Sequence, residues 1–491
     1  MDSDLKTVYD SITAKRAAYD ALDGYYHGDQ PTVYLTRRMR EIFRPLDIAF
    51  TENWCSVVVD ACNERINLTG FEATDARAED VLAAAWDRNQ IAIEAGDIHT
   101  DALVLGECYA IVWPDEDGLA EVYYNDARMI HCTYSESSPR KMSMAGKLWR
   151  GDDGRAKITL YYPDRIEYYT SERKFESVSS AEAFSPDMSA FPTGQAANPY
   201  GEIPVFHFRI NRASISDLKN VLPLQNGINK LLADMLVAAE YGAYNQRWVI
   251  SQGDTSGLKN APGEVWDLPA GDGIGQGTQV GQFQSTDLKN YLDAIDRLSM
   301  AIGVLTRTPK HYFFTQSGDP SGEALIALEA PLNKKAQDRI DRFRPVWRSI
   351  ALFICKIEGV ELESTEVTPQ FERPETVQPK TQADIIKTSV DSGMPLDTAL
   401  TRAGWTESEI EAMNKVKDEG ASKAQAGLAA SLLKAQQDMK MAPMPGRQES
   451  PGRQESPGAG PEFGQQAQGA GKNKQGQNNQ FLNGGSKNAV S

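Results

Sequence analysis

The feature that most constrains this chain is a series of three helical stretches in its second half. Apolar residues fall mostly at three- and four-residue steps from Leu218 to about Tyr244 and again from Leu288 to Ile302, which predicts two amphipathic helices. A third run, from Gly322 to Glu358, has about 37 residues and would span about 55 Å as one helix. Pro331 and Pro345 are expected to kink it. Long helices with apolar faces need partners that cover those faces.

A segment dense in Gly and Pro, from Trp248 to Phe283, separates the first two of these helices. It contains the short strand-like pieces RWVIS and EVWDLP, which predict a small β insertion. The run GDGIGQG at Gly271 to Gly277 has the glycine content of a phosphate-binding loop, but it matches neither known spacing and no Lys follows at the required place. We interpret it as a turn, so the order is helix, compact insertion, helix.

The chain up to about residue 210 predicts an α+β region. The first hundred positions are mostly helical in pattern. From Ala102 to Phe208 the pattern changes to short β-branched and aromatic runs, such as CYAIVW and RIEYYT, broken by Asp, Gly and Pro. These runs are typical of an antiparallel sheet. The segment from Ser177 to Asn198 is expected to be a long exposed loop.

Acidic residues outnumber basic ones, 68 against 51, which gives a formal net charge of −17. Affinity for duplex DNA comes largely from Lys and Arg that displace condensed counterions, so tight non-specific DNA binding is disfavoured. This charge is compatible with a protein through which DNA passes without adhering. The stretch from Pro443 to Ser491 carries the repeat PGRQES PGRQES, is rich in Gly, Gln, Asn, Pro and Ser, and is expected to be disordered.

No pattern in the sequence nominates a catalytic, cofactor or metal site. The five histidines are never at metal-ligand spacing, and the adjacent His131 and Cys132 would point to opposite faces of a strand. There is no nucleophile elbow, so nothing indicates an enzyme and no cofactor is expected. Neither a membrane span nor a signal peptide is expected. The cysteines are too few and too unevenly spaced for a disulfide framework, which indicates a reduced, cytosolic protein: Cys55, Cys62, Cys108, Cys132 and Cys355.

The loop LTRTPKHYFFTQSGDPS, from Leu305 to Ser321, places basic residues beside three aromatic ones. Thr, Pro and Gly around them predict an exposed loop, and exposed aromatic side chains are costly unless they meet a partner. Aromatic side chains are also often buried, so the alternative is that they fold back into the core. The pattern leaves both possibilities open.

Four segments carry a resemblance to a known family: YYHGDQ at Tyr25 to Gln30, NWCSVVVDACNERINLTGF at Asn53 to Phe71, NRASISDLKNVLPLQNGINKLLADML at Asn211 to Leu236 and SGEALIALEAPLNKKAQDRIDRF at Ser321 to Phe343. In this order and spacing they resemble the bacteriophage portal proteins, specifically the siphophage portal family. The resemblance covers residues 1 to about 420. Each segment is moderately specific by itself.

The resemblance implies a portal fold of the α+β class, with an α/β wing, a helical stem, a small β-containing clip, a kinked long helix and a helical crown. Carried over to this chain, the regions are the wing at 1–215, a stem helix at 216–244, the clip at 245–285, a second stem helix at 286–304, the tunnel loop at 305–320, the long kinked helix and wing return at 321–375, the crown at 376–420 and a disordered tail at 421–491. The kink near Pro331 is a competing location for the loop that faces the channel.

The resemblance also implies a ring, usually of twelve copies, at one capsid vertex, where it is the channel for DNA packaging and ejection. The implied partners are the terminase large subunit, the head-tail adaptor, the major capsid and scaffolding proteins and the double-stranded DNA in the channel, with no membrane. The protein would assemble in the host cytoplasm and remain in the virion. Portals of this kind have no ATPase motif and none is present here, so the motor would be a separate protein.

Two sets of site residues follow from the implied regions. A tunnel loop that touches DNA would carry Arg307, Lys310, His311, Tyr312, Phe313 and Phe314. Docking of terminase and adaptors at the clip would use Trp248, Lys259, Glu264, Trp266 and Asp267.

Two other functions are alternatives to that of a portal. Another virion protein, such as a minor capsid or adaptor protein, would lack the order of helix, insertion, helix, loop and long helix. A soluble α+β enzyme that uses buried carboxylates would need a His, Lys or metal cluster beside them, and the sequence shows none.

Overall fold

The computed structural model describes residues 3–30, 51–189, 191–243, 247–251, 255, 258, 266, 279–284, 286–313, 322–375, 379–403, 405 and 409–417. The chain divides into two compact units, Met1–Trp405 and Thr406–Ser491. In the second unit the described residues, 409–417, are helical. The elements named below belong to the first unit, which mixes helices and sheets as the α+β prediction requires.

A three-stranded antiparallel sheet in the order β10-β2-β3 lies inside the first unit. Its strands are β2 (Glu107–Pro114), β3 (Ala120–Asn125) and β10 (Val205–Arg209). The first six residues of β2 are all buried, because β2 is the middle strand and both α5 (Ile91–Leu105) and α8 (Gly322–Ile357) pack against it. A strand buried on both faces reads as a continuous apolar run, which is why CYAIVW was recognisable in the sequence.

The larger sheet is antiparallel, six-stranded and ordered β4-β5-β6-β7-β8, with β9 also paired to β7. Its strands are β4 (Ile130–Tyr134), β5 (Met142–Arg150), β6 (Arg155–Tyr161), β7 (Arg165–Lys174), β8 (Phe184–Pro186) and β9 (Gln195–Ala197). Helix α1 (Ser3–His27) packs against β4 and β5. A Cβ added at Gly146 would lie 2.5 Å from a methyl carbon of Val8, so α1 reaches this sheet only because position 146 has no side chain.

The segment from Ser177 to Asn198 is not the exposed loop that its composition predicts. Its strands β8 and β9 pair with β7, and Ala181 and Asp187 are buried. Asp187 lies 3.5 Å from Lys157, which compensates its charge. The segment therefore covers an edge of the sheet, a pairing that stretches of only three residues do not reveal in sequence.

A small two-stranded sheet joins an early and a late segment of the first unit. Strand β1 (Leu68–Ala73) pairs antiparallel with β13 (Val367–Phe371), with Ala73 opposite Val367. Helices α3 (Trp54–Asn63) and α4 (Ala76–Arg88) flank β1 in the chain. The first hundred residues are thus mostly helical, as predicted, but they also contain a strand whose partner lies near the other end of the unit.

The main core forms around α8, where Phe343, Trp347 and Phe353 are buried. His99 is fully buried among them and stacks on Phe343 at 4.7 Å. Trp347 Nε1 donates a hydrogen bond to His99 Nε2 at 2.9 Å, so the ring's other nitrogen, Nδ1, carries the proton and donates to the carbonyl of Ile66 at 3.1 Å. Burial lowers the pKa of His99 to about 3, and the ring stays neutral.

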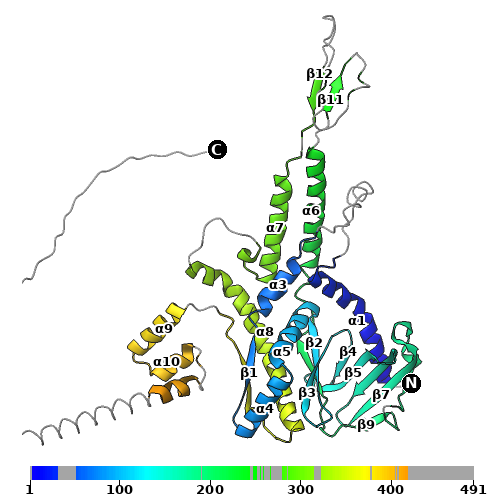
Figure 1. The fold of residues 1–491 in the computed structure, drawn as a ribbon, viewed down its shortest axis with the longest axis vertical. Helices are drawn as coiled ribbons and strands as arrows, with labels where there is room; N and C mark the ends of the chain where they lie inside the picture. The colour runs from blue at the N-terminus through cyan, green and yellow to red at the C-terminus, as the bar shows by residue number, and fades with distance from the viewer. Residues whose placement is uncertain are drawn as a thin grey trace, which may run out of the picture. The chain divides into compact units, whose positions relative to one another are not determined.

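Helices α6 (Leu222–Ala243) and α7 (Lys289–Thr306) run side by side away from the sheets and lead to the hairpin of β11 (Arg247–Ile250) and β12 (Gln279–Gln282) (Figure 1). The order of helix, β insertion and helix is as predicted. Helix α7 begins and ends a few residues later than the expected 286–304. Of the piece EVWDLP only Trp266 is described, and the run GDGIGQG falls outside the described residues.

The long run forms one helix, α8, that continues through Pro331 and Pro345. A proline removes one backbone hydrogen bond and costs about 3 kcal/mol, which burial of large side chains along the helix offsets. The expected kinks stay a prediction. After β13 the chain forms α9 (Pro379–Asp391) and α10 (Leu396–Ala403), which pack on each other within the region predicted as helical crown.

All five cysteines are free and buried, as expected of a reduced chain. Within the described ranges, no helix has the length and apolar content to cross a membrane. Among the same residues, no group of three His, Cys, Asp or Glu side chains is arranged to hold a metal ion.

Candidate functional site: the stem, its root and its distal hairpin

The stem consists of α6 and α7, which pack through a small set of buried residues. Ile228 of α6 and Ile295, Ser299 and Ile302 of α7 are all buried. A Cβ added at Gly227 would lie 3.2 Å from Leu298 Cδ1, so the missing side chain lets the helices approach. The stem is therefore a defined helix pair whose two inner faces are covered by each other.

The outer face of α7 carries large apolar side chains that no other described residue covers. Val304 is 80% exposed, and Leu292, Met300 and Leu305 are each at least 49% exposed. Residues 292, 300 and 304 lie at multiples of four positions, so they fall on one side of the helix. Exposed apolar side chains gathered on one side of a helix mark an interaction surface.

The distal hairpin continues this apolar character. Trp248 of β11 lies opposite Gly281 of β12, and its ring lies against the glycine, in the space where a side chain would stand. Ile250, Val280 and Phe283 are all at least half exposed. The hairpin is thus held by a cross-strand tryptophan and presents apolar side chains to its surroundings.

The structure places only part of the predicted clip residues. The Arg247 guanidinium lies 5.7 Å from the ring centroid of Trp266, so Trp266 and the base of β11 are close together. Lys259, Glu264 and Asp267 lie outside the described residues.

The loop after α7 folds back on the helix end. Arg307 adopts φ 61° in the left-handed region and ends the helix, and the backbone N–H of Thr308 donates to the carbonyl of Gly303 at 3.0 Å. Lys310 to Tyr312 then form a short 3-10 turn. Arg307 and Lys310 are exposed, and neither has a carboxylate at ion-pair distance within the part of the chain that is described. These two cations are accessible to a partner.

Phe313 of this loop folds back into the core, which was one of the two alternatives. Phe313 is buried, and its ring centroid lies 5.1 Å from that of Trp54. A Cβ at Gly303 would lie 3.2 Å from the Phe313 ring, so that glycine makes room for it. Tyr312 is half-buried, 5.8 Å from the Arg65 guanidinium. The structure therefore favours the buried alternative for Phe313, leaves Tyr312 partly exposed, and does not describe Phe314.

Glu329 of α8 ties this loop to the turn after α3, a contact that the sequence did not indicate. Its carboxylate lies 3.6 Å from His311 Nε2 and 3.5 Å from Arg65 Nη2. Arg65 also donates to Asn333 Oδ1 at 2.9 Å and to the carbonyl of Ala61 at 2.9 Å. The base of the loop is thus held against α8 and the turn after α3 by polar side chains.

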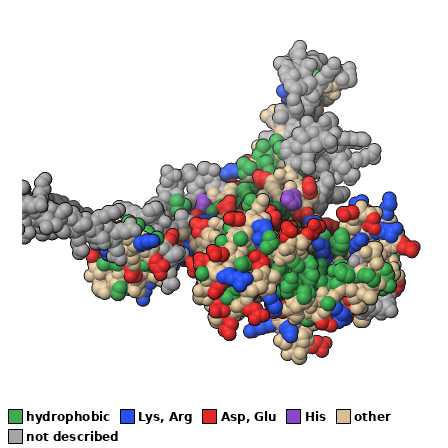
Figure 2. Space-filling model, turned by 60° about the horizontal axis from the view of Figure 1, so that its bottom comes forward, with side chains coloured by type: hydrophobic (Ala, Val, Ile, Leu, Met, Phe, Trp, Pro, Cys, Tyr) green, Lys and Arg blue, Asp and Glu red, His purple; other side chains and the backbone are tan. Residues whose placement is uncertain are grey.

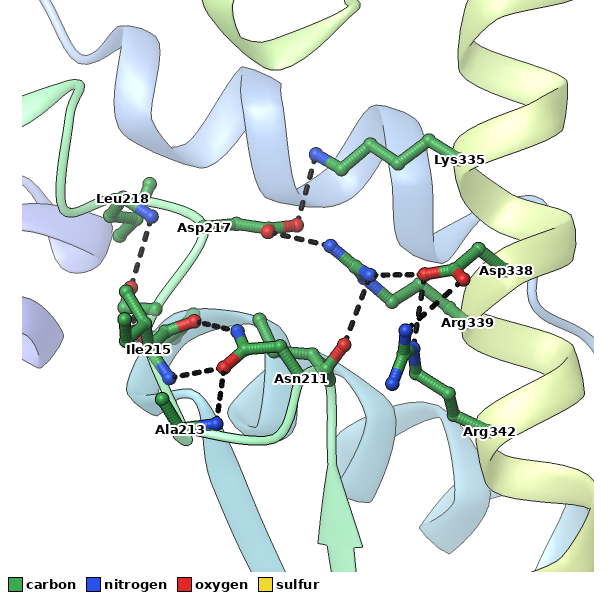
Figure 3. Close-up of polar contacts among 12 residues, drawn as sticks. Asn211, Ala213, Ile215, Asp217, Leu218, Lys335, Asp338, Arg339 and Arg342 are labelled. Atoms are coloured by element: carbon green, nitrogen blue, oxygen red, sulfur yellow. Dashed lines mark hydrogen bonds and ion pairs between the residues drawn. The ribbon is translucent and has the colours of Figure 1, made fainter.

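The stem root, residues 211–218 between β10 and α6, is anchored to α8 by a buried ion cluster (Figure 3). Asp217 lies 2.9 Å from Lys335 Nζ and 2.9 Å from Arg339 Nη2. Arg339 also donates to the carbonyl of Ile210 at 3.1 Å and pairs with Asp338 at 2.7 Å. Each of these charges would be left uncompensated without its partner. The cluster therefore favours one arrangement of the stem root on α8.

Buried amides add a second attachment. Gln225 and Asn229 of α6 are almost completely buried. The Gln225 carbonyl oxygen accepts from the backbone N–H of Trp54 at 3.0 Å, at the first residue of α3. Asn229 accepts from the N–H of Glu52 at 3.2 Å. These side chains of α6 thus accept hydrogen bonds from backbone N–H groups at and just before the start of α3, where a helix offers no partner of its own. The contacts join the stem to the body.

The arrangement offers surfaces for assembly. Exposed apolar side chains lie on α7 and on the hairpin, two accessible cations lie on the loop, and the polar clusters lock elements together. The residues that sequence reasoning missed here are Arg65, Asp217, Glu329, Lys335 and Arg339. Nothing in the spacing of Asp217 indicated ion partners more than a hundred residues away.

Comparison with known proteins gives consistent results. The family described as "Phage portal protein, SPP1 Gp6-like" matches residues 5–426. The portal protein of Mycobacterium phage L5 is 24% identical over 424 residues, which cover 79% of this chain and 82% of that protein. The portal protein of Mycobacterium phage D29 is 25% identical over 401 residues, covering 74% and 78%. A solved structure titled "Neck of empty GTA particle computed with C6 symmetry" aligns with a TM-score of 0.45 and 11% identity, over 76% of this chain and 95% of that one.

Proposed function

The chain belongs to the phage portal protein family, and on that premise we propose that it forms a closed ring at one vertex of a capsid, around a channel through which DNA is packaged and ejected. As a portal protein it is a structural component of the phage particle. The observation that carries the ring is the outer face of α7, where Leu292, Met300, Val304 and Leu305 are exposed. Neighbouring copies in a closed ring cover such faces head to tail.

The negative charge of the chain suits a channel that DNA passes through. Acidic side chains are spread widely over the face of the molecule seen in Figure 2, and the chain has a net charge of −17. A surface of this sign repels phosphate and keeps DNA mobile. In our proposal the tunnel loop at 305–320 faces the channel, and its exposed cations Arg307 and Lys310 contact phosphates transiently, while Tyr312 and Phe313 anchor the loop.

The hairpin region is the proposed docking element for other proteins. Its exposed Ile250, Val280 and Phe283, with Trp248 and Trp266 nearby, suit the apolar centre of a protein interface. We assign the terminase large subunit and the head-tail adaptor to it, with Lys259, Glu264 and Asp267 included on sequence grounds. In the same proposal the major capsid and scaffolding proteins surround the ring, which has twelve copies and assembles in the host cytoplasm. The packaging ATPase is a separate protein, and this chain has no catalytic activity.

A variant pair tests the ring. Val304→Asp places a charge on the exposed face of α7 and should abolish rings, as seen by light scattering and electron microscopy, while circular dichroism stays unchanged. Met188→Asp, at a 63% exposed position between β8 and β9 that lies outside the stem, is the matched control and should still form rings. Rings of unchanged mass and stability from Val304→Asp would contradict the assignment of this face.

A further inference from the structure

A cleft of about 620 Å³ opens at one edge of the three-stranded sheet. Its walls come from β10, which is an edge strand, from the turn between β4 and β5 and from α8. Three cations line it, Arg140, Lys141 and Arg209. We call this site the basic cleft.

The cations of the basic cleft lack carboxylate partners among the described residues. The Arg209 guanidinium lies 5.0 Å from the ring centroid of Tyr134, and no described carboxylate lies at ion-pair distance from any of the three. The one acidic residue of the lining, Glu202, is paired with Lys356 at 2.7 Å. In a chain with an excess of acids, a concave site with three uncompensated cations is a place for an anionic partner.

The floor of the basic cleft is rigid. Tyr134 donates its hydroxyl proton to His207 Nδ1 at 2.7 Å, and His207 Nε2 donates to Glu107 at 3.1 Å. The buried Glu107 also accepts from Lys15 at 2.9 Å and from Tyr19 at 2.6 Å. A fully satisfied buried network holds its members in place, so the cleft is formed before any partner arrives.

The opposite edge of the same sheet has the opposite charge. A second cleft, of about 550 Å³, lies along β3 and is lined by Glu94, Asp115 and Glu121. Its one cation, Arg88, is already paired with Glu358 at 2.6 Å. The neighbouring residues Glu116 and Asp117 are exposed in the turn before β3. We call the following carboxylates the acidic edge: Glu94, Asp115, Glu116, Asp117 and Glu121.

We propose that the basic cleft receives the acidic edge of a second copy of this chain. The inference rests on the proposed ring, since a closed ring requires two different, complementary surfaces on each copy. Strand order places one surface at β10 and the other at β3, on opposite edges of one sheet. Each copy then offers its acidic edge to one neighbour and its basic cleft to the other. Duplex DNA is a poor occupant because the chain's net charge of −17 repels phosphate.

Charge reversal on the full-length protein tests this pairing. Arg140→Glu/Lys141→Glu alters the basic cleft at exposed positions, and Glu94→Lys/Glu121→Lys alters the acidic edge. Each variant alone should need about tenfold more protein than the wild type to form rings at low salt, and the defect should shrink at high salt because the repulsion is screened. A 1:1 mixture of the two variants should restore rings, because every interface in an alternating ring is again complementary.

The control is Arg173→Glu/Lys174→Glu, which makes the same charge change at exposed residues of β7 outside both clefts and should assemble normally. Rings from both single-surface variants at wild-type concentration would overturn the pairing and leave the ring proposal intact. Loss of rings that mixing does not restore, with normal circular dichroism, would also overturn it. A wild-type chain that forms no ring would instead refute the proposed function.

Discussion

Replacing Asp217 by Asn should weaken the attachment of the stem to the body. The change is nearly isosteric but removes the carboxylate that compensates Lys335, whose side chain is 8% exposed, and one partner of Arg339, which is 12% exposed. Removing one partner of a buried ion pair costs about 3 to 5 kcal/mol. Because Arg339 keeps its bonds to Ile210 and Asp338, we expect the lower end, about 3 kcal/mol of unfolding free energy.

The assay is urea unfolding followed by tryptophan fluorescence at one fixed protein concentration, so that assembly contributes equally to each variant. Asp234→Asn is the matched control, because its partner Lys230 lies on the same stem helix in an exposed pair and should matter by less than about 1 kcal/mol. Lys335→Met added to Asp217→Asn should recover part of the loss by removing the uncompensated charge. A loss below about 1 kcal/mol for Asp217→Asn would refute the claim that this cluster anchors the stem.

Three further outcomes are expected. Since the pKa of His99 is about 3 in the folded chain and 6.5 in the unfolded chain, this group should remove about 2 kcal/mol of stability as the pH falls from 7 to 5, and His99→Gln should lower the slope of a stability-against-pH curve. Gly146→Val should destabilise the contact of α1 with β5 by about 2 kcal/mol in thermal unfolding, whereas Gly70→Ala, where a Cβ meets nothing within 4 Å, should change little. Trp266→Ala and Trp248→Ala should leave rings intact but weaken adaptor binding in a pull-down.

Local periodicity was enough to predict the elements of the stem. The apolar positions of α6 and α7 repeat at three and four residues because each helix buries one face, so their existence and order could be read directly. Their ends were less certain: α7 extends to Thr306 because the left-handed Arg307 ends it, and conformation at a single residue leaves little trace in a hydrophobic pattern.

Contacts between distant residues could not be predicted in the same way. Strand β1 looked like part of a helical region because its partner β13 lies almost three hundred residues further on. The cluster of Asp217, Lys335 and Arg339 depends on how α8 crosses the stem root, and charged residues in an acidic chain are too common for spacing to single out such a set. The loop aromatics were left between two alternatives, and the space at Gly303 decides for burial of Phe313.

The central claim is that copies of this chain close into a ring around a hole. The most direct measurement is the mass of the purified wild-type protein by light scattering, followed by electron microscopy of the same sample. The account predicts particles of high mass that show a ring with a central opening. A uniform monomer at every concentration and salt tested would contradict it.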